Sequence, residues 1–93
     1  MKDKLLEIIN HYGVMHQLKY FQSEVFELNE AIIQYENTDT INKKHIAEEI
    51  ADVCVLLNQI IEYYKISRAD INMNMVFKID RQLDRIKGEQ NEE

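Results

Sequence analysis

Proline is absent from this 93-residue sequence, and glycine occurs only at positions 13 and 88. Because these two residue types interrupt helices most strongly, their scarcity predicts long regular helices. The apolar content of 45% excludes a disordered or collagen-like chain. A single cysteine, Cys54, excludes an intrachain disulfide, and its apolar neighbours predict a buried thiol in a protein of the reducing cytoplasm.

Positive charge and long apolar runs are also scarce. Eleven lysines and arginines stand against seventeen aspartates and glutamates, and the net charge of −6 disfavours binding to the phosphate backbone of nucleic acids. The longest uninterrupted apolar run, residues 53–57, is far shorter than the ~18 residues that a membrane span requires. We therefore expect a cytoplasmic protein with neither a nucleic-acid nor a membrane partner.

Apolar residues recur at helical spacing along almost the whole chain, which predicts an all-α fold and one domain over residues 1–93. Gly13 is expected to end the first helix, and the polar residues 36–40 to join the second and third. Ser67, with Asp70 three residues later, is expected to cap the fourth helix, and Gly88 to end it before a frayed acidic tail over residues 88–93. The predicted helices span residues 2–12, 14–35, 41–65 and 68–87.

Four acidic residues stand out by their spacing. Glu24 and Glu27 lie three residues apart on the second predicted helix, as do Glu49 and Asp52 on the third, so each pair projects from one helix face. If these helices form an antiparallel hairpin, Glu24 lies beside Asp52 and Glu27 beside Glu49. Both pairs share residue 38 as their midpoint, which is the centre of the predicted loop. The pattern therefore predicts four carboxylates at one level of the hairpin.

Such a cluster needs a compensating positive charge. Four like charges within a few ångströms cost several kcal/mol unless protons or a cation are present. Oxygen ligands without histidine or thiolate suit Mg²⁺ or Mn²⁺, and the absence of any glutamate followed three residues later by histidine disfavours a di-iron site. The alternative is that these acids are ordinary surface charges paired with Lys43 and Lys44.

The same residues carry a resemblance to a known family. The segments are Gln17-Leu18, Ser23-Glu24-Val25-Phe26-Glu27-Leu28 and, after the polar loop, Ala47-Glu48-Glu49-Ile50-Ala51-Asp52-Val53. Over about residues 10–87 the chain resembles the all-α nucleoside triphosphate pyrophosphohydrolases, the MazG-like and dimeric dUTPase-like group, whose pattern is E-x-x-E followed by E-x-x-D. This resemblance implies a four-helix bundle-like MazG-type fold with a central antiparallel helical hairpin, completed by oligomerisation.

The resemblance also implies an activity. It is the Mg²⁺-dependent cleavage of a nucleoside or deoxynucleoside triphosphate to the monophosphate and pyrophosphate, a nucleotide-pool house-cleaning reaction, with Mn²⁺ as a possible substitute metal. A bound cation can neutralise the triphosphate and acidify the attacking water, while a carboxylate accepts the proton. Ser23 stands where many relatives have a further glutamate, so the acid that activates water is left open, with Glu48 as one candidate. The implied metal ligands and catalytic residues are Glu24, Glu27, Glu49 and Asp52.

Basic residues on the fourth predicted helix are candidates for phosphate binding. Lys78, Arg81 and Arg85 follow one another at helical spacing, and similar proteins place cations on this helix to meet phosphates. Lys78 and Arg81, nearer the start of the helix, are the stronger candidates. The alternative is a solvated face that exchanges ion pairs with Asp80 and Asp84.

Three residues upstream of the acids are candidates for contact with the base of the substrate. Gln17 offers an amide, and Tyr20 and Phe21 offer aromatic rings, although Phe21 also fits a core position and Tyr20 stands where similar proteins often have a basic residue. The preferred base and sugar are not encoded in any motif.

Assembly is predicted from the width of an apolar surface. Between residues 50 and 61 the third predicted helix is apolar over most of its circumference, whereas a helix buried on one side needs a stripe of about 100°. A soluble monomer seldom leaves such a surface uncovered. We therefore expect a homodimer or homotetramer. An alternative function from another class is a non-catalytic helical oligomerisation or regulatory module that retains the fold.

Overall fold

Four α-helices and no strand are found in residues 1–34 and 42–91, the part of the chain that the computed structural model describes. The helices are α1 (Lys2–Tyr12), α2 (Val14–Ile33), α3 (Lys43–Tyr64) and α4 (Arg68–Asn91). The predicted all-α class is confirmed. The predicted loop at residues 36–40 and the last two residues of the predicted tail lie outside the described residues.

Local signals set several helix ends. Gly13 separates α1 from α2 with a φ of 91°, in the positive region that favours glycine, and its N–H donates to the Ile9 carbonyl at 2.8 Å. The Asn42 side chain caps α3 by accepting from the His45 N–H at 3.1 Å. The Ser67 hydroxyl accepts from the Asp70 N–H at 3.2 Å, as predicted for the start of α4.

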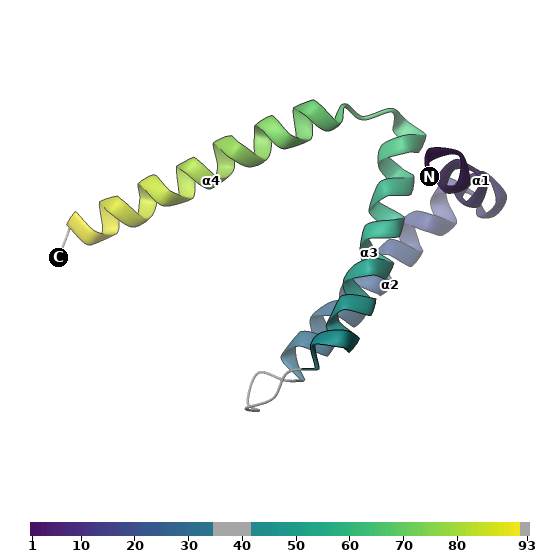
Figure 1. Cartoon of the computed structure of the whole chain (residues 1–93), viewed down its shortest axis with the longest axis horizontal. Coiled ribbons are helices and arrows are strands. Elements are labelled where there is room, and N and C mark those ends of the chain that lie inside the picture. Colours follow the sequence, from purple (N-terminus) through teal and green to yellow (C-terminus); the bar gives the residue numbers. More distant parts are fainter. Residues whose placement is uncertain (35–41, 92–93) are drawn as a thin grey trace.

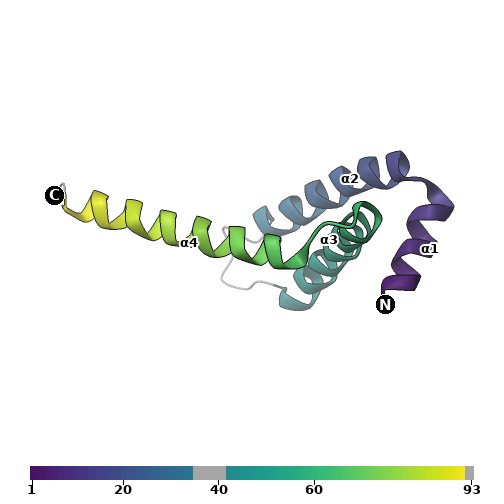
Figure 2. The ribbon, with the colours of Figure 1, turned by 90° about the horizontal axis from the view of Figure 1, so that it is seen from above.

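The helices α2 and α3 form an antiparallel hairpin, and α1 packs across the end of it that lies away from the connecting segment (Figure 1). Figure 2 shows α1 and α2 on one side of α3. The buried apolar residues come from these three helices and are Leu5, Ile9, Ala31, Leu56 and Ile61. The core that positions the candidate site is therefore made by α1, α2 and α3.

A buried hydrogen bond fixes the register of the hairpin. The Gln17 Nε2 donates to the Gln59 Oε1 at 2.8 Å, from one helix to the other. These two residues share residue 38 as their midpoint, which is the midpoint predicted for the acidic pairs. The alignment expected from the spacing of the acids is thus the one that α2 and α3 adopt.

α4 leaves the other helices and extends away from them (Figures 1 and 2). It follows Lys65, whose φ of 55° is left-handed, and an ion pair of 3.0 Å between Arg68 and Glu62 joins its first turn to the end of α3. None of the residues in α4 is buried. A closed four-helix bundle is therefore not formed by the described residues of one chain. No helix in residues 1–34 and 42–91 has both the length and the apolar character needed to cross a bilayer.

Two local predictions are wrong. α4 does not end before Gly88 but continues to Asn91, because a glycine inside a helix costs only about 1 kcal/mol. Cys54 is exposed rather than buried. Since α1 and α2 cover one side of α3, apolar residues on its other sides stay accessible, as Ile50 and Leu57 also do.

Candidate metal centre

Three of the four predicted acids lie together between α2 and α3. One carboxylate oxygen from each of Glu24, Glu49 and Asp52 lies within 4.8 Å of the other two. Glu24 is buried, Glu49 is half-buried and Asp52 is exposed, so the group runs from the helix interface to the surface. We call these three residues the acidic trio.

Two oxygens of the acidic trio have no hydrogen-bond partner. The Oε2 atoms of Glu24 and Glu49 are buried, and neither accepts a hydrogen bond within the described structure. A buried carboxylate oxygen without a partner carries a desolvation cost of at least about 1–3 kcal/mol. The arrangement is therefore incomplete without a group that interacts with these oxygens.

Positive side chains do not supply that group within residues 1–34 and 42–91. The one cationic side chain within 4.0 Å of the acids is His45, whose Nε2 lies 4.0 Å from Glu49, and only a protonated imidazole would carry charge there. Neither Lys43 nor Lys44 forms an ion pair with the acids in this part of the chain, although both precede them on α3. The alternative of lysine-paired surface acids is not the arrangement observed.

Glu27, the fourth predicted acid, lies beside the acidic trio and is exposed. The negative charge of Glu24 is the main cause that raises the pKa of Glu27, with smaller contributions from desolvation and from Glu49 and Asp52. Hydrogen bonding to Glu24 and its negative charge also raise the pKa of the Tyr20 phenol. The charge of Glu27 thus interacts with those of the trio, although only three of the four predicted acids come together as a group of possible ligands.

The donor set fits a small hard cation. Carboxylate oxygens are the ligands that Mg²⁺ and Mn²⁺ prefer, and oxygens on opposite sides of a magnesium ion lie about 4.2 Å apart at bond lengths of about 2.1 Å. The three oxygens of the trio lie within 4.8 Å of one another, which is close to this distance. The two buried oxygens without partners are the atoms that such an ion would satisfy.

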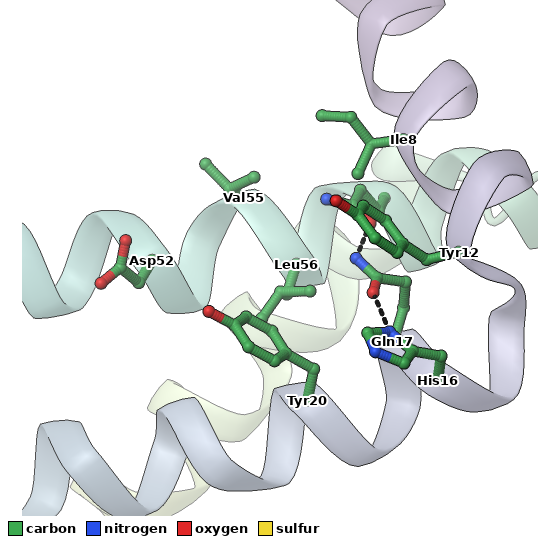
Figure 3. Close-up of a pocket in the computed structure, with 9 residues that line it drawn as sticks. Ile8, Tyr12, His16, Gln17, Tyr20, Asp52, Val55 and Leu56 are labelled. Carbon is green, nitrogen blue, oxygen red and sulfur yellow. Dashed lines mark hydrogen bonds between the residues drawn. The ribbon is translucent and has the colours of Figure 1, made fainter.

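A cavity of about 390 Å³ adjoins the acidic trio, and Asp52 belongs to both (Figure 3). Its aromatic wall is made by Tyr12 of α1 and by His16 and Tyr20 of α2. Figure 3 shows the Tyr20 ring reaching from α2 toward α3. The size lies in the range of small-molecule sites, which are usually lined by apolar and aromatic groups with a few polar atoms.

Two amides lie at the inner end of this cavity. Gln17 and Gln59 are only 5% and 2% exposed, and the hydrogen bond between them crosses from α2 to α3. Gln17 also contacts the ring of His16, with 2.7 Å between Oε1 and Nδ1. Apolar side chains complete the lining, namely Ile8, Val55 and Leu56.

Of the predicted substrate-binding residues, only Gln17 and Tyr20 lie at the cavity beside the acidic trio. Phe21 is half-buried and does not line this cavity. Lys78 and Arg81 are exposed on α4, where they line a separate surface depression. The structure therefore joins Gln17 and Tyr20 to the acids but does not bring the basic residues to them within one chain.

The sequence-based reasoning missed three residues of the cavity: Tyr12, His16 and Gln59. The signal for Gln59 was present, because Gln17 and Gln59 share the midpoint that identified the acids. The signal for the aromatic wall was the four-residue spacing of Tyr12, His16 and Tyr20, which was obscured by Gly13 between α1 and α2. Comparison with known proteins adds no assignment, since no family model, no curated protein and no solved structure matches the chain.

Proposed function

We propose that the protein is an Mg²⁺-dependent nucleoside triphosphate pyrophosphohydrolase of the MazG-like kind, which cleaves an NTP or dNTP to the monophosphate and pyrophosphate. The observation that supports this proposal most is the acidic trio, in which two buried oxygens lack partners. Its placement beside a cavity of small-molecule size gives a substrate room next to the acids. We also retain a cytoplasmic location, with no nucleic-acid or membrane partner, as part of the proposal.

The residues divide into different chemical tasks. Bound magnesium would neutralise charge on the triphosphate and acidify the attacking water. The acidic trio would hold the ion, which leaves the exposed Glu27 to accept a proton. An exposed carboxylate beside the ion can act as the general base for the attacking water. The water oxygen would bond to the α-phosphorus while its proton passes to Glu27. The bond between the α-phosphorus and the oxygen that bridges to the β-phosphate would break, which releases pyrophosphate and leaves the monophosphate.

The experiment is an assay of the purified protein with a panel of ordinary and modified nucleoside triphosphates. We expect pyrophosphate and a monophosphate in equal amounts with Mg²⁺ or Mn²⁺, and no products with EDTA. A protein carrying Asp52→Asn, prepared identically, controls for contaminating phosphatases. Absence of pyrophosphate across the panel would favour the non-catalytic oligomerisation or regulatory module.

We further propose that Lys78 and Arg81 bind the triphosphate, with a second copy of the chain bringing them to the acids. No ion pair of either residue occurs within the described part of the chain, so Asp80 and Asp84 leave both cations available. The acids lie on helices that pack together, whereas the cations lie on α4, which extends away. One chain therefore separates the charges that phosphate binding would combine.

A homodimer or homotetramer is supported by the apolar face of α4. The spacing of Val76, Ile79, Leu83 and Ile86 alternates between three and four residues, the heptad pattern of helices that pair with one another. Each of these side chains is between 48% and 58% exposed, because none of the helices α1, α2 and α3 packs along α4. We call these four residues the α4 apolar seam.

Light scattering at micromolar concentration tests the assembly. We expect two or four times the chain mass of 11.1 kDa. Leu83→Lys in the apolar seam should lower the measured mass toward that of one chain, whereas Glu7→Lys, at an exposed position on α1, should leave it unchanged. A mass of 11.1 kDa in a fully active preparation would refute the proposed assembly.

A further inference from the structure

The cavity beside the acidic trio has a partly aromatic lining that suits a ring-shaped ligand. The rings of Tyr12 and His16 are stacked at 5.2 Å with an 18° angle, and those of His16 and Tyr20 follow at 6.3 Å and 9°. Rings stacked in this way face one another, so they offer a flat heteroaromatic ligand their edges and the outer face of the ring at either end of the row. Asp52 connects this wall to the proposed phosphate-binding end.

A directed chain of hydrogen bonds crosses the inner end of the cavity. The His16 Nδ1 lies 2.7 Å from the Gln17 Oε1, and because an amide oxygen can only accept, the imidazole nitrogen is the donor. The other end of the same amide, Gln17 Nε2, donates to Gln59 Oε1 at 2.8 Å. The two hydrogen bonds thus run in one direction, from His16 through Gln17 to Gln59.

This direction leaves one donor unused. The oxygen of Gln59 is occupied by Gln17, and the Gln59 amino group forms no hydrogen bond with any residue in the described ranges. Gln59 lines the cavity, and its amino nitrogen is not among the buried, unpartnered atoms of the described residues, so this donor is accessible from the cavity. A ligand oxygen in the cavity could accept a hydrogen bond from it.

We propose that this cavity binds the base of a nucleotide, and that the Gln59 amino group selects bases whose facing edge carries a carbonyl oxygen over bases that carry an amino group there. The identification of the ring as a base rests on the proposed function. The selection itself follows from the donor at Gln59, because an amino group facing it would leave two donors opposed.

The test uses neutral nucleosides and metal-free protein, so that neither phosphate nor metal contributes. Dissociation constants are measured by NMR titration in EDTA for uridine against cytidine and for inosine against adenosine, since each pair exchanges a carbonyl for an amino group. We expect the carbonyl-bearing member to bind about tenfold more tightly in both pairs. Equal affinities, a preference for the amino-bearing members, or no binding at millimolar concentration would overturn the proposal.

Substitution of Gln59 tests the residue. Gln59→Glu keeps an oxygen that accepts from Gln17 but replaces the amino group by an acceptor, so the tenfold preference should disappear or reverse. Gln59→Met removes the donor without adding charge and should also abolish the preference, which covers a failure of the first variant to fold. Gln22→Glu, the same change at an exposed position outside the cavity, should preserve it. Retention of the preference in both Gln59 variants would refute the assignment.

The outcomes separate this proposal from the activity. Selective nucleoside binding by a protein that releases no pyrophosphate would refute the enzyme and leave the cavity assignment standing. Pyrophosphate release by a protein that binds uridine and cytidine equally would support the enzyme and refute the base selection by Gln59.

Discussion

The interface between α2 and α3 contains two polar levels that lie one heptad apart and behave differently. At one level Gln17 meets Gln59, and seven residues along each helix Glu24 meets Asp52, with Glu49 beside them. The amides hydrogen-bond to each other at 2.8 Å. The carboxylates leave two buried oxygens without any partner in the described structure.

The contrast shows which polar side chains can hydrogen-bond to each other across a helix interface without a bound proton or cation. An amide carries both a donor and an acceptor, so two amides can satisfy each other, whereas an ionised carboxylate only accepts and repels its neighbours. The amide level therefore serves stability and orientation in the isolated chain. The carboxylate level requires protons or a cation, which is why it is the candidate metal centre.

The largest expected effect comes from removing charge at the carboxylate level. Glu24→Gln, Glu49→Gln and Asp52→Asn should each lower turnover by about 100-fold or more, because each weakens the proposed metal site. The same changes should keep or raise the melting temperature of the metal-free protein, since like-charge repulsion is removed. Pyrophosphate release and thermal melting in EDTA measure the two effects.

Glu7→Gln on α1 is the matched control for these variants, because it removes one exposed carboxylate away from the trio. Unchanged turnover and metal affinity in Glu49→Gln and Asp52→Asn would contradict the carboxylate site.

A second prediction tests whether positive charges on α4 bind the triphosphate next to the carboxylates. Lys78→Ala and Arg81→Ala should each weaken triphosphate binding about tenfold, as expected for charge-assisted contacts to phosphate, and leave metal binding intact. Titration calorimetry with a non-hydrolysable triphosphate measures both quantities. Lys2→Ala on α1 is the control. Unaltered affinity in both α4 variants would return these residues to a solvated surface face.

A third prediction concerns the amide level. Gln17→Leu or Gln59→Leu alone should lower the free energy of unfolding by about 1–3 kcal/mol, because the remaining amide is left buried without its partner. The double leucine variant should cost less than the sum of the two single changes, since no polar group is then left unpaired. Urea unfolding of the metal-free protein tests this, and strict additivity would show that the hydrogen bond contributes little.

The smallest expected effect is a dependence on pH. The raised pKa of Glu27 means that the folded metal-free protein holds this proton at pH values where the unfolded chain has lost it. The contribution of Glu27 to stability is therefore full below its ordinary pKa and is lost as the pH rises through the raised value. Melting temperatures in EDTA should fall through this window relative to those of Glu27→Gln.

Added Mg²⁺ should oppose this pH effect, because a cation favours the ionised acids. A wild-type curve parallel to that of Glu27→Gln would contradict the electrostatic coupling of Glu27 to the trio.

Much of the fold could be predicted because its signals are local or periodic. Apolar spacing gave the four helices, Gly13 and Ser67 marked their ends, and the equal distances of Glu24 and Asp52 from residue 38 gave the register of the hairpin. The meeting of three acids follows from that register and from helix geometry. These are properties that a sequence carries residue by residue.

The rest depends on which surface of each helix is covered, and spacing does not specify this. Asp52 and Cys54 sit within the most apolar segment yet are exposed, because α1 and α2 cover only part of α3. Gln59 could be found only by pairing it with Gln17 across the hairpin. The departure of α4 was not predictable for the same reason, since an apolar stripe favours packing against some surface but does not specify which one.

If α4 packs only against another copy of the chain, as proposed, the folding of this 24-residue helix depends on protein concentration. Most helical stability in proteins comes from the packing of an apolar face, and α4 buries no residue in its own chain. Under the proposed assembly, its backbone amides would exchange their hydrogens with water faster as the protein is diluted, while those of α2 and α3 remain protected. Because Lys78 and Arg81 lie on this helix, specific activity would fall with dilution before the acidic trio is disturbed.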